Sequence, residues 1–259
     1  MIRLVHVELL KLRTVRSTYG MLAAAALLTT LDAVLIAAQS GSSTRPPLFT
    51  AAGLRGPIST IGFALLLSWI LGITVSSGEF RNRTATLTYL AAPRRGQVLA
   101  AKAIAAGFVG AVFGVVGVLL STGVGLAFVA GDGYSVALGG TTIADYALGA
   151  VVGSALLAAL GVAVGSLIRA QLGAVVAILL WGFFVESTLS NLVKGLGSYL
   201  PFTAATTLGG APLATGGFGF PNSSSASPLP FPAVVVLLVG ITAAVSALAA
   251  RTTVTSDVT

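Results

Sequence analysis

The chain has 259 residues, of which 56% are hydrophobic and only 8% are charged, and it carries a net charge of +7. Soluble domains carry about 25% charged residues, so this composition excludes a single water-soluble core. With no cysteine and one histidine, His6, the chain also lacks the residues for disulfides, thiolate metal sites or histidine-rich metal sites.

Residues 1–17, MIRLVHVELLKLRTVRS, precede the first long apolar stretch and are amphipathic. Ile2, Val5, Leu9 and Leu12 recur at steps of three and four and therefore share one helix face. A basic amphipathic helix beside a membrane span is typical of the membrane interface. We predict such an interfacial helix here, with a frayed cytoplasmic tail as the alternative.

Six apolar stretches are long enough to cross a bilayer, whose hydrocarbon core takes about 20 helical residues. We therefore predict an all-α membrane protein with six transmembrane helices in a single domain, 1–259. The third stretch is longer than a membrane requires, so we expect its first turns, around Lys102, to project into water or the helix to tilt. The stretches are Tyr19–Gln39, Pro57–Ser77, Val98–Ala130, Ile143–Ile168, Leu172–Asn191 and Phe231–Ala250.

The distribution of cations predicts the orientation of these spans. With the N-terminus inside, the cytoplasmic segments hold eleven of the fourteen Lys and Arg residues, and the outer loops hold Arg45, Arg55 and Lys194. Because cytoplasmic loops carry an excess of Lys and Arg, both termini are predicted to be cytoplasmic. The cations flank apolar runs, which indicates topology and contact with anionic lipid rather than nucleic-acid binding.

The segment between the second and third spans combines charge with helix signals. It reads GEFRNRTATLTYLAAPRRGQVLAAK over residues 78–102. Ser76 and Glu79 have capping-box spacing, and Pro93 disfavours helix at the residue before it. We predict a short cytoplasmic helix within 78–96 whose aromatic and apolar residues dock on a partner. Charge that only sets topology is the alternative, but it does not explain the helix signals.

Glycines at small-xxx-small spacing favour close helix packing. They occur in the third span, as Gly107, Gly110, Gly114 and Gly117, and in the fourth, as GAVVG and GVAVG. These patterns predict a tight bundle.

The longest predicted outer loop is 192–230. Its second part is rich in Gly, Ser and Pro, which is typical of irregular structure. Its first part is more apolar, and we expect short helices there, folded back against the outer membrane face.

Two carboxylates fall inside predicted spans, Asp32 in the first and Glu186 near the outer end of the fifth. A charge at a helix centre costs about 2.5–3.5 kcal/mol. Each carboxylate is interpreted either as a polar lining or coupling-ion site, or as a group that is wet, protonated or paired to a neighbour.

Catalytic motifs are absent from the sequence. It contains no G-x-x-x-x-G-K-[ST], G-x-S-x-G, H-E-x-x-H or C-x-x-C, and its seven carboxylates are scattered. We therefore predict that the chain is not itself an enzyme.

Several motifs in order are similar to those of one transporter family. Glu8–Gly20 is an acidic, hydrophobic, then basic segment, and Tyr199–Pro201 reads YLP. Between spans two and three stand Glu79, Phe80, Arg81, Thr84, Pro93, Arg95 and Lys102. In order and topology, over nearly the whole chain, the sequence resembles the permease subunit of bacterial ATP-binding cassette exporters of the second type.

The resemblance implies a membrane subunit without its own ATPase. A pair of permeases and two separate ATP-binding subunits, which hold ATP and Mg, would form the exporter in a bacterial plasma membrane, and this chain would bind no cofactor. Residues 1–17 would be the connecting helix and 78–96 the coupling helix. Hydrophobic or amphipathic cargo would leave between the two protomers, beside spans two and five. The implied coupling residues are Glu79, Phe80, Arg81, Arg83, Thr84, Leu87, Pro93 and Arg95.

Two other classes remain open from the sequence. An ion-coupled secondary transporter would use Asp32 and Glu186 as proton sites, but such folds often show internal repeats and no convincing repeat is visible. A membrane scaffold or immunity protein would bind a partner without transport.

Overall fold

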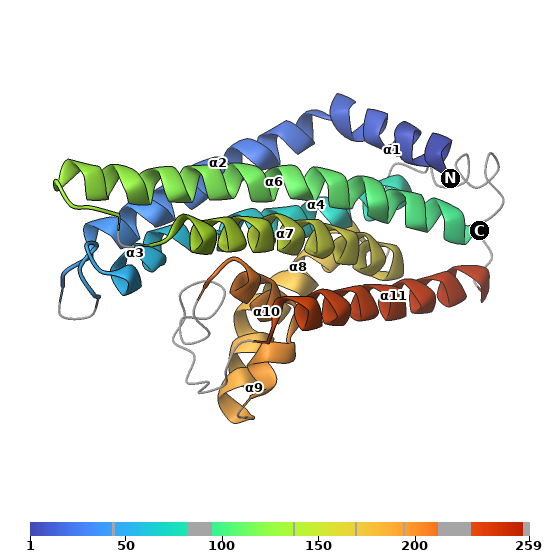
Figure 1. The fold of residues 1–259 in the computed structure, drawn as a ribbon. Helices are drawn as coiled ribbons and strands as arrows, with labels where there is room; N and C mark the ends of the chain where they lie inside the picture. Colours follow the sequence, from blue (N-terminus) through green and yellow to red (C-terminus); the bar gives the residue numbers. More distant parts are fainter. Residues whose placement is uncertain are drawn as a thin grey trace.

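The regular structure in the computed structural model is helical throughout the described residues (Figure 1). These are 1–42, 45–81, 95–136, 138–168, 170–193, 195–211 and 229–255, without the side chains of 79–81, 95 and 252–255.

The helices follow the predicted order. They are α1 (Ile2–Thr14), α2 (Arg16–Ala38), α3 (Ala51–Ile58), α4 (Gly62–Arg81), α6 (Arg95–Gly131), α7 (Gly140–Ile168), α8 (Gln171–Leu180), the π-helix η1 (Trp181–Val185), α9 (Glu186–Leu192), the 3-10 helix η2 (Leu196–Tyr199), α10 (Pro201–Leu208) and α11 (Phe231–Thr255).

The expectation of six membrane-spanning helices is confirmed by length and composition. The candidate spans are Arg16–Ala38, Ala51–Gly78, Gly96–Gly131, Gly140–Ile168, Gln171–Leu192 and Phe231–Arg251. Figure 1 shows α1, the start of α6 and the end of α11 at the same end of the bundle, here called the terminal end.

Helix α7 lies at the centre of the bundle, between α6 and α11 and against α4 (Figure 1). Its glycines permit this. A Cβ on Gly161 would collide with the carbonyl oxygen of Trp69, and one on Gly165 would lie 2.8 Å from the carbonyl oxygen of Ile73. From α6, a Cβ on Gly114 would lie 2.7 Å from the Cα of Val151. The predicted small-residue packing is therefore confirmed at these contacts.

The second span is two helices rather than the single one expected over Pro57–Ser77. Helix α3 ends at Ile58 and α4 begins at Gly62. Pro57 lies in the last turn of α3, and the Thr60 backbone N–H and hydroxyl both donate to its carbonyl, at 3.3 and 2.6 Å. The backbone N–H and the hydroxyl of Thr60 thus replace the regular helical hydrogen bonds at the break.

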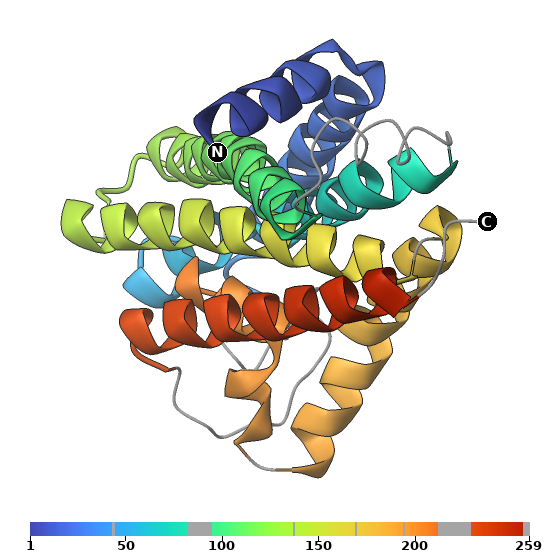
Figure 2. The ribbon, with the colours of Figure 1, turned by 90° about the vertical axis from the view of Figure 1, so that its right-hand side faces the viewer.

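The expectation that Ser76 starts a helix is wrong, because α4 runs through it to Arg81 and its side chain is buried. For the long third span, exposure to water is not found at Lys102, which is 4% exposed, and the alternative of a tilted helix stays a prediction. Helix α1 lies beside the first part of α6 (Figure 2).

The first part of 192–230 contains short helices as expected, η2 and α10, and α10 lies within the bundle. It packs on α7, α11 and α4, and its residues from Pro201 to Thr206 are buried. The rings of Trp69 and Phe202 stack with centroids 6.0 Å apart. A Cβ on Gly149 would collide with the Leu208 carbonyl, so a glycine on α7 makes room for α10.

The contact between α4 and α7 predicts that Gly161→Ala destabilises the protein. The added methyl group would strike the Trp69 carbonyl, and overpacking of this kind costs about 1–3 kcal/mol. The matched control is Gly123→Ala in α6, where nothing lies within 4 Å of the new Cβ. Thermal unfolding in detergent should give a lower midpoint for Gly161→Ala only, and equal midpoints would contradict the close approach.

Candidate functional site

The predicted coupling residues lie largely outside the described part of the chain. Glu79, Phe80 and Arg81 form the last turn of α4, and Arg95 begins α6, but their side chains are not described. Arg83, Thr84, Leu87 and Pro93 fall within the undescribed segment 82–94. Their role remains a prediction.

A buried ion pair joins α1 to the first part of α6. Lys102 Nζ lies 3.2 Å from Glu8 Oε2, and Lys11 Nζ lies 2.9 Å from Glu8 Oε1. Glu8 is 6% exposed and Lys102 is 4% exposed, whereas the Lys11 side chain is 45% exposed. One carboxylate therefore holds a buried cation from another helix and a half-exposed cation from its own.

This pair decides which face of α1 meets the bundle. Glu8 and Leu12 are the buried residues of α1, while Ile2 is 87% exposed. The packed face thus contains a carboxylate, and the expected purely apolar face is only partly used. Because a buried charge without its partner is strongly destabilising, Glu8 and Lys102 fix the position of α1 along α6.

The second intramembrane carboxylate, Glu186, holds the N-terminus of α10. Its side chain is 1% exposed. It accepts hydrogen bonds from the Phe202 N–H at 2.9 Å, from the Thr203 N–H at 2.8 Å and from the Thr203 hydroxyl at 2.9 Å. The first N–H groups of a helix have no partner within it and favour a negative charge. Glu186 supplies both the acceptor and the charge.

A π-helical turn positions this carboxylate. In η1 the Glu186 N–H bonds to the Trp181 carbonyl, five residues earlier. The wider turn brings the side chains of these two residues together, and Trp181 Nε1 donates to Glu186 Oε1 at 2.9 Å. Single π turns within α-helices often occur at functional positions; here the turn directs Glu186 toward α10.

A cation from α3 holds the opposite end of α10. Arg55 Nε donates to the Gly210 carbonyl at 2.8 Å, and its guanidinium lies 5.3 Å from the centre of the Tyr146 ring. Gly210 has a φ of +87°, and a Cβ there would lie 2.6 Å from the Tyr146 ring. A positive charge is favourable at a helix C-terminus, so α10 has opposite charges at its two ends.

Asp32 lies apart from these groups. It is half-buried on α2 and interacts electrostatically with Arg45. Helix α2 packs on α6, α4 and α3, whereas the span of Glu186 begins against α4 and α7 (Figure 1). The structure does not bring the two intramembrane carboxylates into one site.

The described residues offer little reactive chemistry. Among them, no three His, Cys, Asp or Glu side chains gather where they would hold a metal ion. The buried polar groups in the described part of the chain mostly pair elements together, as Glu8 and Glu186 do. This arrangement positions helices relative to one another.

A scan against protein-family models finds no match to the chain, and a search of curated proteins finds no significant relative.

Sequence reasoning named Glu8 and Lys102 but did not pair them. The available signal was Glu8 on the same helix face as Val5 and Leu12, with a lysine inside an apolar run. Two opposite charges on apolar faces favour each other. Arg55 offered no comparable signal, because its acceptor is a backbone carbonyl 155 positions away.

The Glu186 contacts predict that Glu186→Ala frees α10. The chain has no native cysteine, so Thr206→Cys provides a unique label at a residue that is 2% exposed. Leaving buried donors unpaired costs about 1–3 kcal/mol each, so maleimide labelling in detergent should accelerate about tenfold or more. The labelling rate of Glu186→Gln should lie between those of Glu186→Ala and the parent. Asp32→Ala alters no contact of α10, so its labelling rate should match that of the parent. Equal rates for Glu186→Ala and the parent would contradict the capping role.

The ion pair predicts a strong penalty for Lys102→Met. The substitution leaves the buried Glu8 with only a half-exposed lysine, and breaking a buried pair costs about 3–5 kcal/mol. Replacing both partners, as Glu8→Leu with Lys102→Met, should recover much of that loss because no unpaired charge remains. Unfolding midpoints of the parent, Glu8→Leu, Lys102→Met and the double variant test this, and additive losses from the two single substitutions would show that the two charges do not interact.

Proposed function

We propose that the chain is the permease subunit of an ATP-driven exporter in a bacterial plasma membrane. In this proposal a separate ATP-binding subunit engages the segment between α4 and α6, and a second permease copy completes the cargo path. The observation that carries it is the Glu8–Lys102 pair, which lies seven residues into α6 from Arg95.

The pair supports the proposal on mechanical grounds. A partner acting on residues 82–94 would act on the end of α4 and the start of α6 together, since both helices adjoin that segment. The buried pair would pass motion of α6 to α1, and α1 is followed directly by α2. A transporter with two alternating states needs such rigid connections between its moving elements.

The α8–α9 span is consistent with a second copy. Only 17% of its most apolar stretch is buried against the rest of the chain. Figure 2 shows its later part extending away from the other helices. Large apolar residues along it, including Phe184 and Leu192, are 65% and 74% exposed. Together with α4, this span would face the cargo path between protomers.

The contacts of Glu186 disfavour the proton-coupled alternative. All four of its hydrogen bonds are made to Trp181 and to the start of α10, and Asp32 lies on a different helix of the bundle. A proton site in Glu186 would have to release α10 at every cycle.

The proposal predicts an ATPase partner that depends on the end of α4. The tagged chain, purified from its native membrane, should bring down a subunit with a phosphate-binding loop. Glu79→Ala and Arg81→Ala should weaken this association by about tenfold, the effect of losing one interface anchor. The control is Arg13→Ala, which removes an exposed cation of α1.

ATP hydrolysis by the reconstituted complex gives the second readout. The permease should stimulate its partner, and the two α4 variants should lose that stimulation while Arg13→Ala keeps it. Recovery of no ATPase, with transport driven by a proton gradient alone, would overturn the proposal in favour of a secondary transporter. A stable partner without ATPase activity or transport would favour a scaffold.

A further inference from the structure

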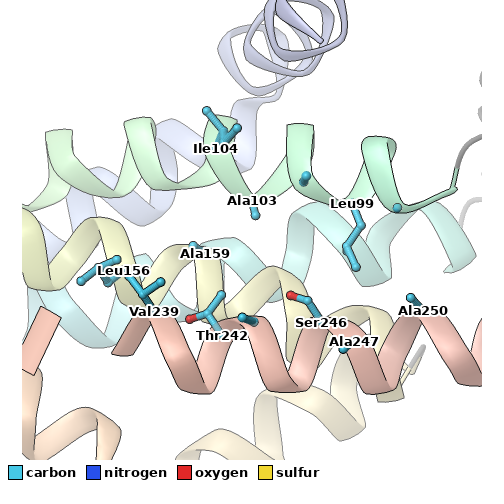
Figure 3. Close-up of a pocket in the computed structure, with 13 residues that line it drawn as sticks. Leu99, Ala103, Ile104, Leu156, Ala159, Val239, Thr242, Ser246, Ala247 and Ala250 are labelled. Carbon is cyan, nitrogen blue, oxygen red and sulfur yellow. The ribbon is translucent and has the colours of Figure 1, made fainter. Parts of the chain in front are cut away.

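A groove of about 450 Å³ lies between α6, α7 and α11 (Figure 3). Leu99 and Ala103 of α6 line it opposite Thr242, Ser246 and Ala247 of α11, with Leu156 and Ala159 of α7 at its floor. At its edges Ile104 is 53% exposed and Val239 is 49% exposed. The groove therefore opens sideways, toward the surroundings of the bundle.

The lining suits a hydrocarbon chain better than water. Small residues such as Ala103, Ala243 and Ala247 hollow the groove. The Thr242 hydroxyl already donates to the Leu238 carbonyl at 2.7 Å. A bound water needs two to four polar partners, and this wall supplies few. If the groove were empty, its lining atoms would lack dispersion contacts, which a bound hydrocarbon chain would supply.

The length of the groove matches one leaflet of a bilayer. Its lining on α11 runs from Val239 to Ala250, which at 1.5 Å per residue is about 16 Å. Half of the hydrocarbon core is about 15 Å. A volume of 450 Å³ over that length makes the groove long and narrow, which suits a single acyl chain.

A cation stands at the terminal end of the groove. Arg251 is exposed and follows Ala250, the last lining residue of α11. Basic sites between membrane helices on the cytoplasmic side bind anionic headgroups, and the terminal end is the one that the cation distribution predicts to be cytoplasmic.

We propose that this groove binds an anionic phospholipid, with one acyl chain along α11 and the phosphate at Arg251. The site would hold a lipid of the inner leaflet against α6 and α11, which otherwise make few contacts with each other. The inference stands on the groove and on Arg251 and does not depend on the proposed transport function.

Native mass spectrometry of the full chain in detergent tests the site, with phosphatidylglycerol and phosphatidylcholine as probes. The parent should retain phosphatidylglycerol more strongly. The variant Ala243→Leu with Ala247→Leu fills the groove and should bind both lipids weakly. Its control is Ala244→Leu, an exposed residue of the same helix that does not line the groove.

The headgroup contact has a separate test. Arg251→Gln should weaken phosphatidylglycerol binding about fivefold, the loss expected for one cation at an anionic surface, and leave phosphatidylcholine binding unchanged. Arg16→Gln, at the start of α2, should change neither. Because Arg251 is exposed, this variant is expected to fold even if the filled groove does not. Unchanged lipid selectivity in Arg251→Gln, or parent-like binding in a folded filled variant, would overturn the proposal.

Discussion

Buried backbone groups at helix ends require partners, and this requirement governs the irregular parts of the bundle. Helix α10 is enclosed by α7, α11 and α4, so water does not supply those partners. Glu186 supplies them at one end of α10, and Arg55 bonds the carbonyl of Gly210 at the other. The break between α3 and α4 follows the same rule, since the Thr60 hydroxyl bonds the Pro57 carbonyl there. At both ends of α10 and at the break after α3, a polar side chain thus compensates for the departure from a continuous helix.

The glycines of α7 connect this polar capping to the packing of the bundle. Gly161 receives the backbone of α4 near Trp69, and Gly149 receives that of α10 at Leu208. Trp69 in turn stacks on Phe202, whose N–H is bonded to Glu186. Helices α4, α7 and α10 therefore form one interlocked unit, in which a shift of any member disturbs both close packing and hydrogen bonds. The span from α8 to α9 is attached to this unit mainly through its first turns and through the Glu186 cap.

The sequence predicted the spans well because their signal is local. Apolar length marks each helix, and glycine spacing marked the face of α6 that meets α7 and the faces of α7 that meet α4 and α10. Long-range features were not accessible in this way. The capping spacing at Ser76 was overridden because α4 continues through a buried serine. The position of α10 depends on which surface its apolar residues meet, and the partners of Glu186 lie 16 and 17 positions away. For Glu186 the sequence left pairing to a neighbour and ion coupling open, and the structure shows the pairing. The coupling residues of 79–95 remain predictions.

The Glu8–Lys102 pair is best understood as a device of register rather than of stability. Replacing a buried ion pair by apolar residues often costs little, so the pair is weak evidence for added stability. An apolar α1 would pack on α6 in several registers, because leucine and valine tolerate sliding past one another. A single carboxylate opposite a single buried ammonium is matched in one register only, since any shift of a turn, about 5.4 Å, would separate Glu8 from Lys102. The pair therefore favours one arrangement of α1 against the first part of α6. A movement of α6 near Arg95 would then move α1 with it, because the two helices would not slide past each other.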